Sequence, residues 1–216
     1  MVDVAVVVCF LDKEGSLMHK SSLDKMSWFV GTYLADFRGL NKSILDLGSY
    51  DVNGSYRNFF NDPAWEYQGI DMEAGKNVDI VLQNPYVWKE IKSQSKDVLI
   101  SGQAFEHVEF FWVLMDEMAR VVKPGGLICI IAPSRGYEHR YPVDCWRFYP
   151  DAFRALARYA GLELLYVETQ WDDKGYTVDD SDAWGDTIAV MQRPETWSLK
   201  FKVILMLRKL INFVSV

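Results

Sequence analysis

Residues that could hold a small charged ligand follow the first predicted strand. The stretch runs from Asp46 to Gly54, and its Gly48 comes directly after the strand, where a ligand can approach the backbone closely. A dinucleotide would need a further glycine two residues later, and Tyr50 stands there instead. We therefore expect a ligand with an amino-acid end: Asp46 would attract its ammonium group, and the N–H groups near Gly48 would hold its carboxylate. An ordinary strand-to-helix turn is the alternative.

More polar residues follow the next two predicted strands. Asp71 ends the second strand, where a carboxylate can accept two hydrogen bonds from a ribose diol. Met72 would lie against an adenine face, and the side-chain amides of Gln83 and Asn84 suit the edge of that ring. Each of these residues also suits a turn, so the set supports a ligand site only in combination with the first loop.

A loop after the fifth predicted strand gathers residues suited to proton transfer. Histidine is the natural general base near neutral pH, and we predict that His139 is the base with Asp144 as its orienting partner. His107, near the same sheet edge, is a second candidate or simply a helix N-terminal residue. Aromatic and charged residues offer a sugar stacking faces and hydrogen bonds; the candidates are Arg140, Tyr141, Trp146, Trp171 and Trp184. A well-packed structural loop is the alternative.

A later loop, residues 171–186, is rich in carboxylates. Hard oxygen ligands can hold a divalent ion such as Mg²⁺ or Mn²⁺. The loop lacks the spacing of an EF-hand, and acidic loops are usually just solvated. A third interpretation makes the loop a lid over the substrate, with its tryptophans as stacking faces.

The elements that must position these residues are short and alternate in type. Apolar runs predict strands at residues 43–48, 66–70, 78–82, 97–100, 127–132, 162–169 and 187–192. Helical spacing predicts helices at residues 21–38, 53–60, 108–122, 151–159 and 199–214. Asn53 is the expected N-cap of the second helix, and residues 123–126, Lys-Pro-Gly-Gly, read as a turn.

Strands that alternate with helices indicate an α/β fold. We predict a Rossmann-like, doubly wound, seven-stranded sheet with a last strand that could run antiparallel, and a ligand crevice at the carboxyl ends of the strands. Residues 1–40 would form an N-terminal arm and helix, residues 41–193 the ligand-binding core, and residues 194–216 an amphipathic helix. That last helix would pack on the domain or on a second subunit, or lie on a membrane surface.

Composition excludes several classes of protein. The 216 residues, half of them hydrophobic and a quarter charged, suit one globular domain. A net charge of −7 argues against a general nucleic-acid binder. The three cysteines form no CxxC pair, so we expect a reducing compartment, the cytoplasm. We interpret residues 1–10 as a short strand or packed arm rather than a signal peptide, and we expect no transmembrane span.

Three motifs together resemble one enzyme superfamily. The run Ile44–Gly48, the acidic Asp71, and the run Arg120–Gly126 before an apolar strand are similar to class I S-adenosylmethionine-dependent methyltransferases, over about residues 40–193. The segment Ser101–Val108 resembles the one after the fourth strand in the type 11 group. The stretch Glu138–Pro150 resembles small methyltransferases that accompany glycosyltransferases in surface-glycan synthesis.

The resemblance implies S-adenosylmethionine as cofactor and assigns residues to it. Asp46 and Gly48 would contact the methionyl end, Asp71 the ribose and Met72 the adenine. The other residues expected at the cofactor are Ser49, Tyr50, Asn53, Gln83, Asn84, Ser101 and Gln103. The usual glycine-rich loop is replaced by a longer segment, Ser49–Gly54, which leaves the role of Gly54 open.

These expectations point to transfer of a methyl group to a sugar hydroxyl of a glycan. An alcohol is a poor nucleophile, so the reaction needs a base or a metal ion. A methyltransferase of another small molecule or of a protein is an alternative. A catalytically silent cofactor-binding partner subunit and a plain Rossmann oxidoreductase are the others.

Overall fold

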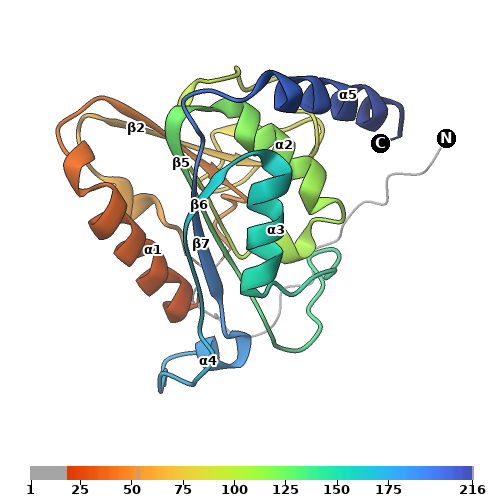
Figure 1. The fold of residues 1–216 in the computed structure, drawn as a ribbon. Helices are drawn as coiled ribbons and strands as arrows, with labels where there is room; N and C mark the ends of the chain where they lie inside the picture. Colours follow the sequence, from red (N-terminus) through yellow and green to blue (C-terminus); the bar gives the residue numbers. More distant parts are fainter. Residues whose placement is uncertain (1–18, 53, 216) are drawn as a thin grey trace.

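A computed structural model describes residues 19–52 and 54–215 of the chain. Its centre is one seven-stranded sheet in the order β3-β2-β1-β4-β5-β7-β6, with helices on both faces (Figure 1). The strands are β1 (Lys42–Leu47), β2 (Trp65–Asp71), β3 (Ile80–Val81), β4 (Lys96–Gly102), β5 (Val122–Ala132), β6 (Glu163–Thr169) and β7 (Thr187–Gln192). The predicted doubly wound, seven-stranded α/β fold is confirmed.

The direction of the strands decides which loops meet at one edge of the sheet. β1 to β5 pair in parallel, whereas β7 runs antiparallel to both β5 and β6, as the sequence allowed for the last strand. The strand order reverses at β1, which has β2 on one side and β4 on the other. The loops after these three strands therefore meet at one edge, where doubly wound sheets bind their ligands.

One face of the sheet is covered by α1 (Lys20–Tyr33) and by the short 3₁₀ helices η1 (Ala35–Phe37) and η2 (Arg57–Phe60). Helical spacing predicted the buried face of α1 correctly, because Met26, Val30 and Leu34 pack in one cluster with Ile44 and Ile100 of the sheet. Burying each of these side chains stabilises the fold by roughly 1.5–3 kcal/mol.

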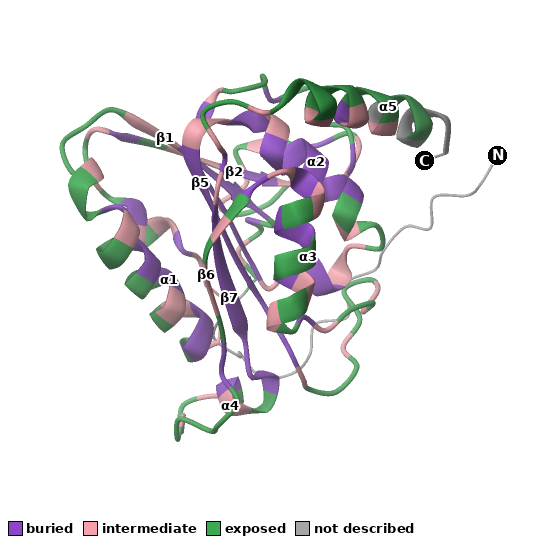
Figure 2. Ribbon diagram, viewed as in Figure 1, coloured by how far each residue is buried: buried purple, intermediate pink, exposed green. Residues whose placement is uncertain are grey.

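The other face is covered by α2 (Phe111–Val121) and α3 (Pro150–Ala160), and the buried residues of both turn toward the strands (Figure 2). Leu114, Met115 and Met118 recur at helical spacing and share a buried cluster with Phe153 of α3. The 3₁₀ helix η3 (Phe105–His107) connects β4 to α2. It carries one of the candidate histidines.

The last helix, α5 (Leu199–Ser215), lies at the end of the molecule opposite α4 (Ser181–Trp184) (Figure 1). Arg208 joins it to the domain by donating to the Tyr159 carbonyl at 2.6 Å and to Asp116 at 3.4 Å. Its other side is apolar and exposed at Leu199, Met206 and Leu210. Among residues 19–52 and 54–215, no helix has the length and apolar character needed to cross a bilayer.

The predicted helix over residues 53–60 is wrong. Only Arg57–Phe60 is helical, as a single 3₁₀ turn. Asp51 accepts a hydrogen bond from the Gly54 N–H and Ser55 from the Arg57 N–H, and such local bonds compete with helix formation. Asn53, the expected N-cap, and residues 1–10, the expected arm, lie outside the described residues.

Three further boundaries differ from the sequence expectation. Residues 123–126 belong to β5, because the Gly125 N–H and the Arg193 N–H pair this segment with the chain that follows β7. The first helix ends at Tyr33 and continues as η1 rather than running to Arg38. The long helix begins at Phe111, after η3, rather than at Val108.

Candidate functional site

The first loop turns sharply at Gly48, whose φ is +76°. The N–H groups of Gly48 and Ser49 both donate to the Ile70 carbonyl, so the loop is held against the end of β2. A Cβ at Gly48 would lie 2.7 Å from the Cβ of Ala104, in the segment after β4. The loops after β1 and β4 are thus in direct contact at this glycine.

Asp71 lies where the sequence analysis needed it, at the end of β2 beside the first loop. Its carboxylate accepts hydrogen bonds from the backbone N–H groups of Tyr50 (3.1 Å) and Glu73 (3.2 Å). Met72 is 44% exposed next to it. The structure therefore brings Tyr50, Asp71 and Met72 together at the open edge, as a ribose and adenine site would require.

Asp46 and Ser101 are less accessible than the sequence suggested. Asp46 is buried, and its carboxylate accepts a hydrogen bond from the Tyr67 hydroxyl. Burial raises the pKa of Asp46 to about 7, and the bond from Tyr67 opposes that rise. The buried Ser101 hydroxyl donates to the Leu47 carbonyl at 3.0 Å. Both side chains serve contacts within the sheet.

The remaining predicted cofactor residues divide into two groups. Asn84 accepts a hydrogen bond from the Tyr86 N–H at 2.7 Å, which is turn chemistry, and Gln83 is exposed beside it. Gln103 has a positive φ of 55°, and its side chain donates to Asp186 at 3.0 Å and to Ser22 at 3.3 Å. Gln103 thus ties the loop after β4 to the start of α1.

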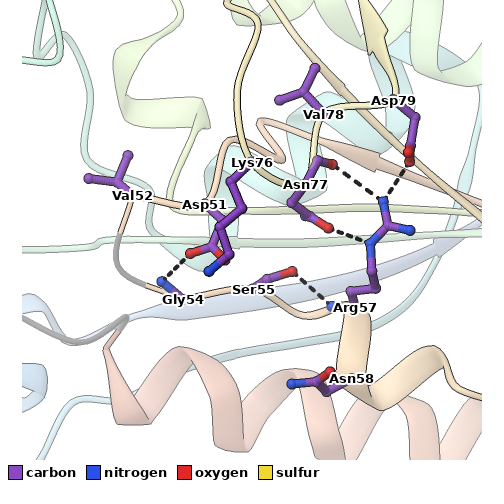
Figure 3. Close-up of a pocket in the computed structure, with 10 residues that line it drawn as sticks. All are labelled: Asp51, Val52, Gly54, Ser55, Arg57, Asn58, Lys76, Asn77, Val78 and Asp79. Atoms are coloured by element: carbon purple, nitrogen blue, oxygen red, sulfur yellow. Dashed lines mark hydrogen bonds and ion pairs between the residues drawn. The ribbon is translucent and has the colours of Figure 1, made fainter.

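A groove of about 770 Å³ opens on the outer side of the first loop (Figure 3). Arg57 crosses it and donates to Asn77 and Asp79, and Lys76 pairs with Asp51 at 2.6 Å. Among the described residues, its lining shares none with the predicted cofactor set. Its charged side chains are paired with one another, and its lining includes Asp51 and Gly54 of the first loop.

The two candidate histidines meet at the carboxyl edge of the sheet. The ring centroids of His107 and His139 lie 4.9 Å apart, with the planes at 81°. The Nδ1 of His107 lies 2.6 Å from the Val143 carbonyl oxygen, which fixes the proton on Nδ1 and leaves a lone pair on Nε2. Burial lowers the pKa of both histidines, so both rings are neutral at pH 7.

Asp144 holds His139 in place. Its carboxylate accepts the backbone N–H of His139 at 2.8 Å, and Oδ2 lies 3.3 Å from the ring Nδ1. Arg147 donates to both oxygens of Asp144 at 2.6 and 2.8 Å and holds the pKa of that carboxyl well below its usual range. Asp144 therefore stays ionised, as an orienting partner should.

The sequence analysis missed Glu106, which completes this cluster. Glu106 is fully buried, and neither carboxylate oxygen has a hydrogen-bond partner within the chain. Burial raises its pKa to about 8. Its Oε1 lies 3.7 Å from Nε2 of His107. The signal that could have revealed it is a Glu-His pair directly after a strand that ends at the crevice.

The predicted sugar-binding residues differ widely in how far their side chains are exposed. Tyr141, at 48% exposed, has its ring centroid 6.2 Å from that of His107, and Trp146 is 38% exposed. Arg140 is exposed and paired with Glu138. Trp171 is exposed but stacks on Tyr149, 5.9 Å between centroids.

Trp184 is not available as a stacking face. It is 3% exposed, and its ring contacts those of His19 (5.3 Å) and His139 (4.5 Å). It therefore packs behind the histidine cluster and supports His139 from within.

The carboxylates of the acidic loop, residues 171–186, form hydrogen bonds and ion pairs with other groups of the chain. Asp182 accepts hydrogen bonds from the N–H groups of residues 174–176. Asp173 pairs with Arg135 at 2.7 Å, and Asp186 accepts from Ser21 and Gln103. These carboxylates hold the loop and the start of α1 together. In the described part of the chain, the residues grouped closely enough to ligate a metal ion are instead Glu106, His107 and His139.

Comparison with known proteins points to one kind of enzyme. Residues 61–130 match the family model described as "Methyltransferase domain". A search of curated proteins gives no match.

Solved structures share the fold at low identity. A SAM-dependent methyltransferase from Archaeoglobus fulgidus is 14% identical, with 80% of this chain and 95% of that chain covered and a TM-score of 0.58. One from Methanosarcina mazei is 11% identical, with 76% and 98% covered and a TM-score of 0.59. The 1,6-didemethyltoxoflavin-N1-methyltransferase of Burkholderia thailandensis, solved with S-adenosylhomocysteine, is 11% identical, with 81% and 79% covered and a TM-score of 0.61.

Proposed function

We propose that this chain, an S-adenosylmethionine-dependent methyltransferase by its fold and its methyltransferase domain, passes the methyl group to a hydroxyl oxygen of a sugar in a glycan. The cofactor supplies a methyl group on a positively charged sulfur. The acceptor oxygen bonds to that carbon while the carbon–sulfur bond breaks, and the hydroxyl proton must leave. The protein has to align the acceptor and help that proton depart.

The residues at the strand ends suit the cofactor. Asp71 would accept the ribose hydroxyls, and Met72 and Tyr50 offer exposed surface beside them. The Ser49 hydroxyl is buried in the first loop without a hydrogen-bond partner, as expected in a loop built to meet a ligand. Tyr67 covers the carboxylate of Asp46, so Asp46 would not contact the cofactor. It would act on the cofactor's ammonium group by electrostatic attraction over a longer distance.

The observation that carries the choice of an oxygen acceptor is the cluster of Glu106, His107 and His139. A hydroxyl is a weak nucleophile near neutral pH and needs a base or a metal ion to help it lose its proton. Ala104 packs against Gly48, and Glu106 and His107 follow it, so the cluster begins next to the cofactor loop. We assign activation of the hydroxyl to this cluster.

The surface around the cluster supports a sugar as the acceptor. The exposed rings of Tyr141 and Trp146 lie on the same loop as His139, and Arg140 adds exposed hydrogen-bond donors. Sugars are held by stacking on aromatic faces and by many hydrogen bonds. The stacking role of Trp184 is withdrawn because that ring is buried.

The test uses the full chain with S-adenosylmethionine and a panel of saccharides, amines and thiols. We expect a saccharide to gain the mass of one CH₂, and Asp71→Ala to abolish that gain. Methylation confined to amines or thiols would mean another small molecule or a protein as acceptor. Cofactor binding with no product on the whole panel would indicate a silent partner subunit.

The setting of the enzyme is also part of the proposal. Cys129 and Cys145 are free thiols, which supports the reducing cytoplasm. The exposed apolar side of α5, with Lys200 and Lys202 beside it, supports contact with a membrane surface or a second subunit. Fractionation of cell extracts with and without residues 199–216 would test that contact.

A further inference from the structure

We infer that Glu106, His107 and His139 form a binding site for a divalent transition-metal ion. The inference deepens the proposed function, because the ion would lie where the acceptor hydroxyl is activated. One ring nitrogen from each histidine and one oxygen of Glu106 all lie within 4.8 Å of one another. Two imidazoles and a carboxylate suit Mn²⁺, Fe²⁺, Co²⁺ or Zn²⁺ better than Mg²⁺, which prefers oxygen alone.

The first argument is the state of Glu106. A buried carboxylate is costly unless a charge or donor compensates it. Glu106 is fully buried, and both of its oxygens have no hydrogen-bond partner within the chain. A cation between this carboxylate and the two histidines would supply the missing partner.

The second argument is distance. Two bonds of about 2.1 Å to one ion can span at most about 4.2 Å. The 3.7 Å between Nε2 of His107 and Oε1 of Glu106 already falls within that limit. One ring nitrogen of His139 completes the group, whose three ligand atoms lie within 4.8 Å of one another.

The third argument is the way the histidines are held. Metal-binding histidines usually donate their other ring N–H to a carbonyl or a carboxylate, which fixes the tautomer. His107 faces the Val143 carbonyl with Nδ1 at 2.6 Å. His139 is held by Asp144 through its backbone N–H and by the ring contact of Trp184. Both histidines are therefore oriented before any ion arrives.

The charges around the cluster favour a cation. Asp144 and Arg147 pair with each other and largely cancel. An ionised Glu106 would then lie beside two neutral rings, and a bound cation would supply its counter-charge. Three protein ligands would also leave coordination positions open for oxygen atoms of the acceptor, and a bound cation lowers the pKa of such a hydroxyl. In this arrangement His139 is a ligand rather than the proton acceptor, and the proton leaves to solvent.

The test measures metal binding directly, without cofactor or acceptor. The chain is freed of metal with a chelator and titrated with Co²⁺, whose visible absorption reports nitrogen and oxygen ligands. We expect one Co²⁺ per chain, displaced by Zn²⁺. Glu106→Gln and His139→Ala should each weaken binding at least tenfold. Asp144→Asn disturbs the positioning of His139 and the pair with Arg147, and it should weaken binding by about tenfold.

Glu138→Gln is the matched control, because Glu138 lies beside His139 in sequence but is exposed and paired with Arg140. It should bind Co²⁺ as the unaltered chain does. Circular dichroism checks that each variant is folded, and should Glu106→Gln unfold, His139→Ala decides alone. No Co²⁺ absorption, or absorption equal in all variants, overturns the site.

The outcomes separate the two proposals. Co²⁺ binding lost in the cluster variants, with no methylated saccharide, leaves the metal site standing and removes the sugar acceptor. Methylated saccharide formed at an undiminished rate in a chelator, with no Co²⁺ binding, supports the sugar acceptor and overturns the metal site.

Discussion

The rings of His107 and His139 lie 4.9 Å apart, although one follows β4 and the other follows β5. Parallel pairing of β4 with β5 makes this meeting possible, because it brings both carboxyl ends to one edge. Asp144 and Val143, from the same loop as His139, then hold the two rings.

Replacing His139 should separate chemistry from cofactor binding. We expect His139→Ala to lower kcat by roughly 10² or more, because the cluster that activates the hydroxyl loses one of its three members. Affinity for S-adenosylhomocysteine should stay within about twofold, because none of the contacts found for His139 involve the first loop or Asp71. Steady-state kinetics and calorimetric titration measure the two effects. Unchanged kcat would remove His139 from the reaction.

Replacing Asp71 should do the reverse. Asp71→Ala is expected to weaken S-adenosylhomocysteine binding by about tenfold or more, since two ribose hydrogen bonds to a charged group would be lost. Glu66→Ala is the control, because Glu66 is an exposed carboxylate near the other end of the same strand. Equal affinities of the two variants would exclude Asp71 from the ribose site.

Alanine substitutions at two glycines measure how much the contact between the first loop and the segment after β4 contributes to the free energy of unfolding. Gly48 and Gly39 have φ values of +76° and +73°, but only at Gly48 would a Cβ meet another atom, the Cβ of Ala104 at 2.7 Å. Gly39→Ala should cost about 1 kcal/mol of unfolding free energy from φ alone. Gly48→Ala should cost about 1–3 kcal/mol more from overpacking. Urea denaturation compares them, and equal losses would contradict the contact.

Glu106 makes stability depend on pH in the metal-free chain. Burial raises its pKa from 4.5 to about 8, so the folded state binds the proton more tightly than the unfolded state. Its contribution to the free energy of unfolding is complete below pH 4.5 and is lost as pH rises toward 8, by at most about 1.4 kcal/mol per pH unit. Glu106→Gln should remove this slope. Urea titrations in a chelator at pH 5 and pH 8 measure it, and parallel slopes would contradict the burial argument.

The exposed aromatic rings should affect the acceptor alone. Trp146→Ala is expected to raise KM for the saccharide by about threefold to tenfold, the value of one stacking contact. Trp28 is equally exposed, at 38%, but lies on α1, so Trp28→Ala serves as the control. A change in cofactor affinity with Trp146→Ala, or equal effects of both variants, would argue against a stacking role.

Much of the fold could be predicted from the sequence because its signals are periodic. Apolar spacing identified the seven strands and the buried face of α1, since both depend on residue type at fixed intervals. The prediction of a helix over residues 53–60 was wrong because Asp51 and Ser55 accept hydrogen bonds from nearby N–H groups. Such local competition has no periodic signature. The prediction of a turn at residues 123–126 was wrong because this segment pairs with Arg193, in a distant part of the chain.

The sequence predicted only part of the candidate site, because burial and packing have no periodic signature. Asp71 ends β2, and His107 and His139 lie in the segments that follow β4 and β5, which the sequence indicates directly. Burial is a property of the packed molecule, so neither the covering of Asp46 by Tyr67 nor the enclosure of Trp184 could be anticipated. Glu106 was missed for the same reason, because a glutamate is usually exposed and its isolation appears only in three dimensions.

The close approach of Ala104 to Gly48 links two parts of the proposed site. Residues 104–107 form one turn, in which the His107 N–H donates to the Ala104 carbonyl. We expect any shift of the first loop on binding the nucleoside to be passed to His107. Binding of the methyl donor should then change the affinity for the acceptor, and binding of the acceptor should change the affinity for the donor to the same extent.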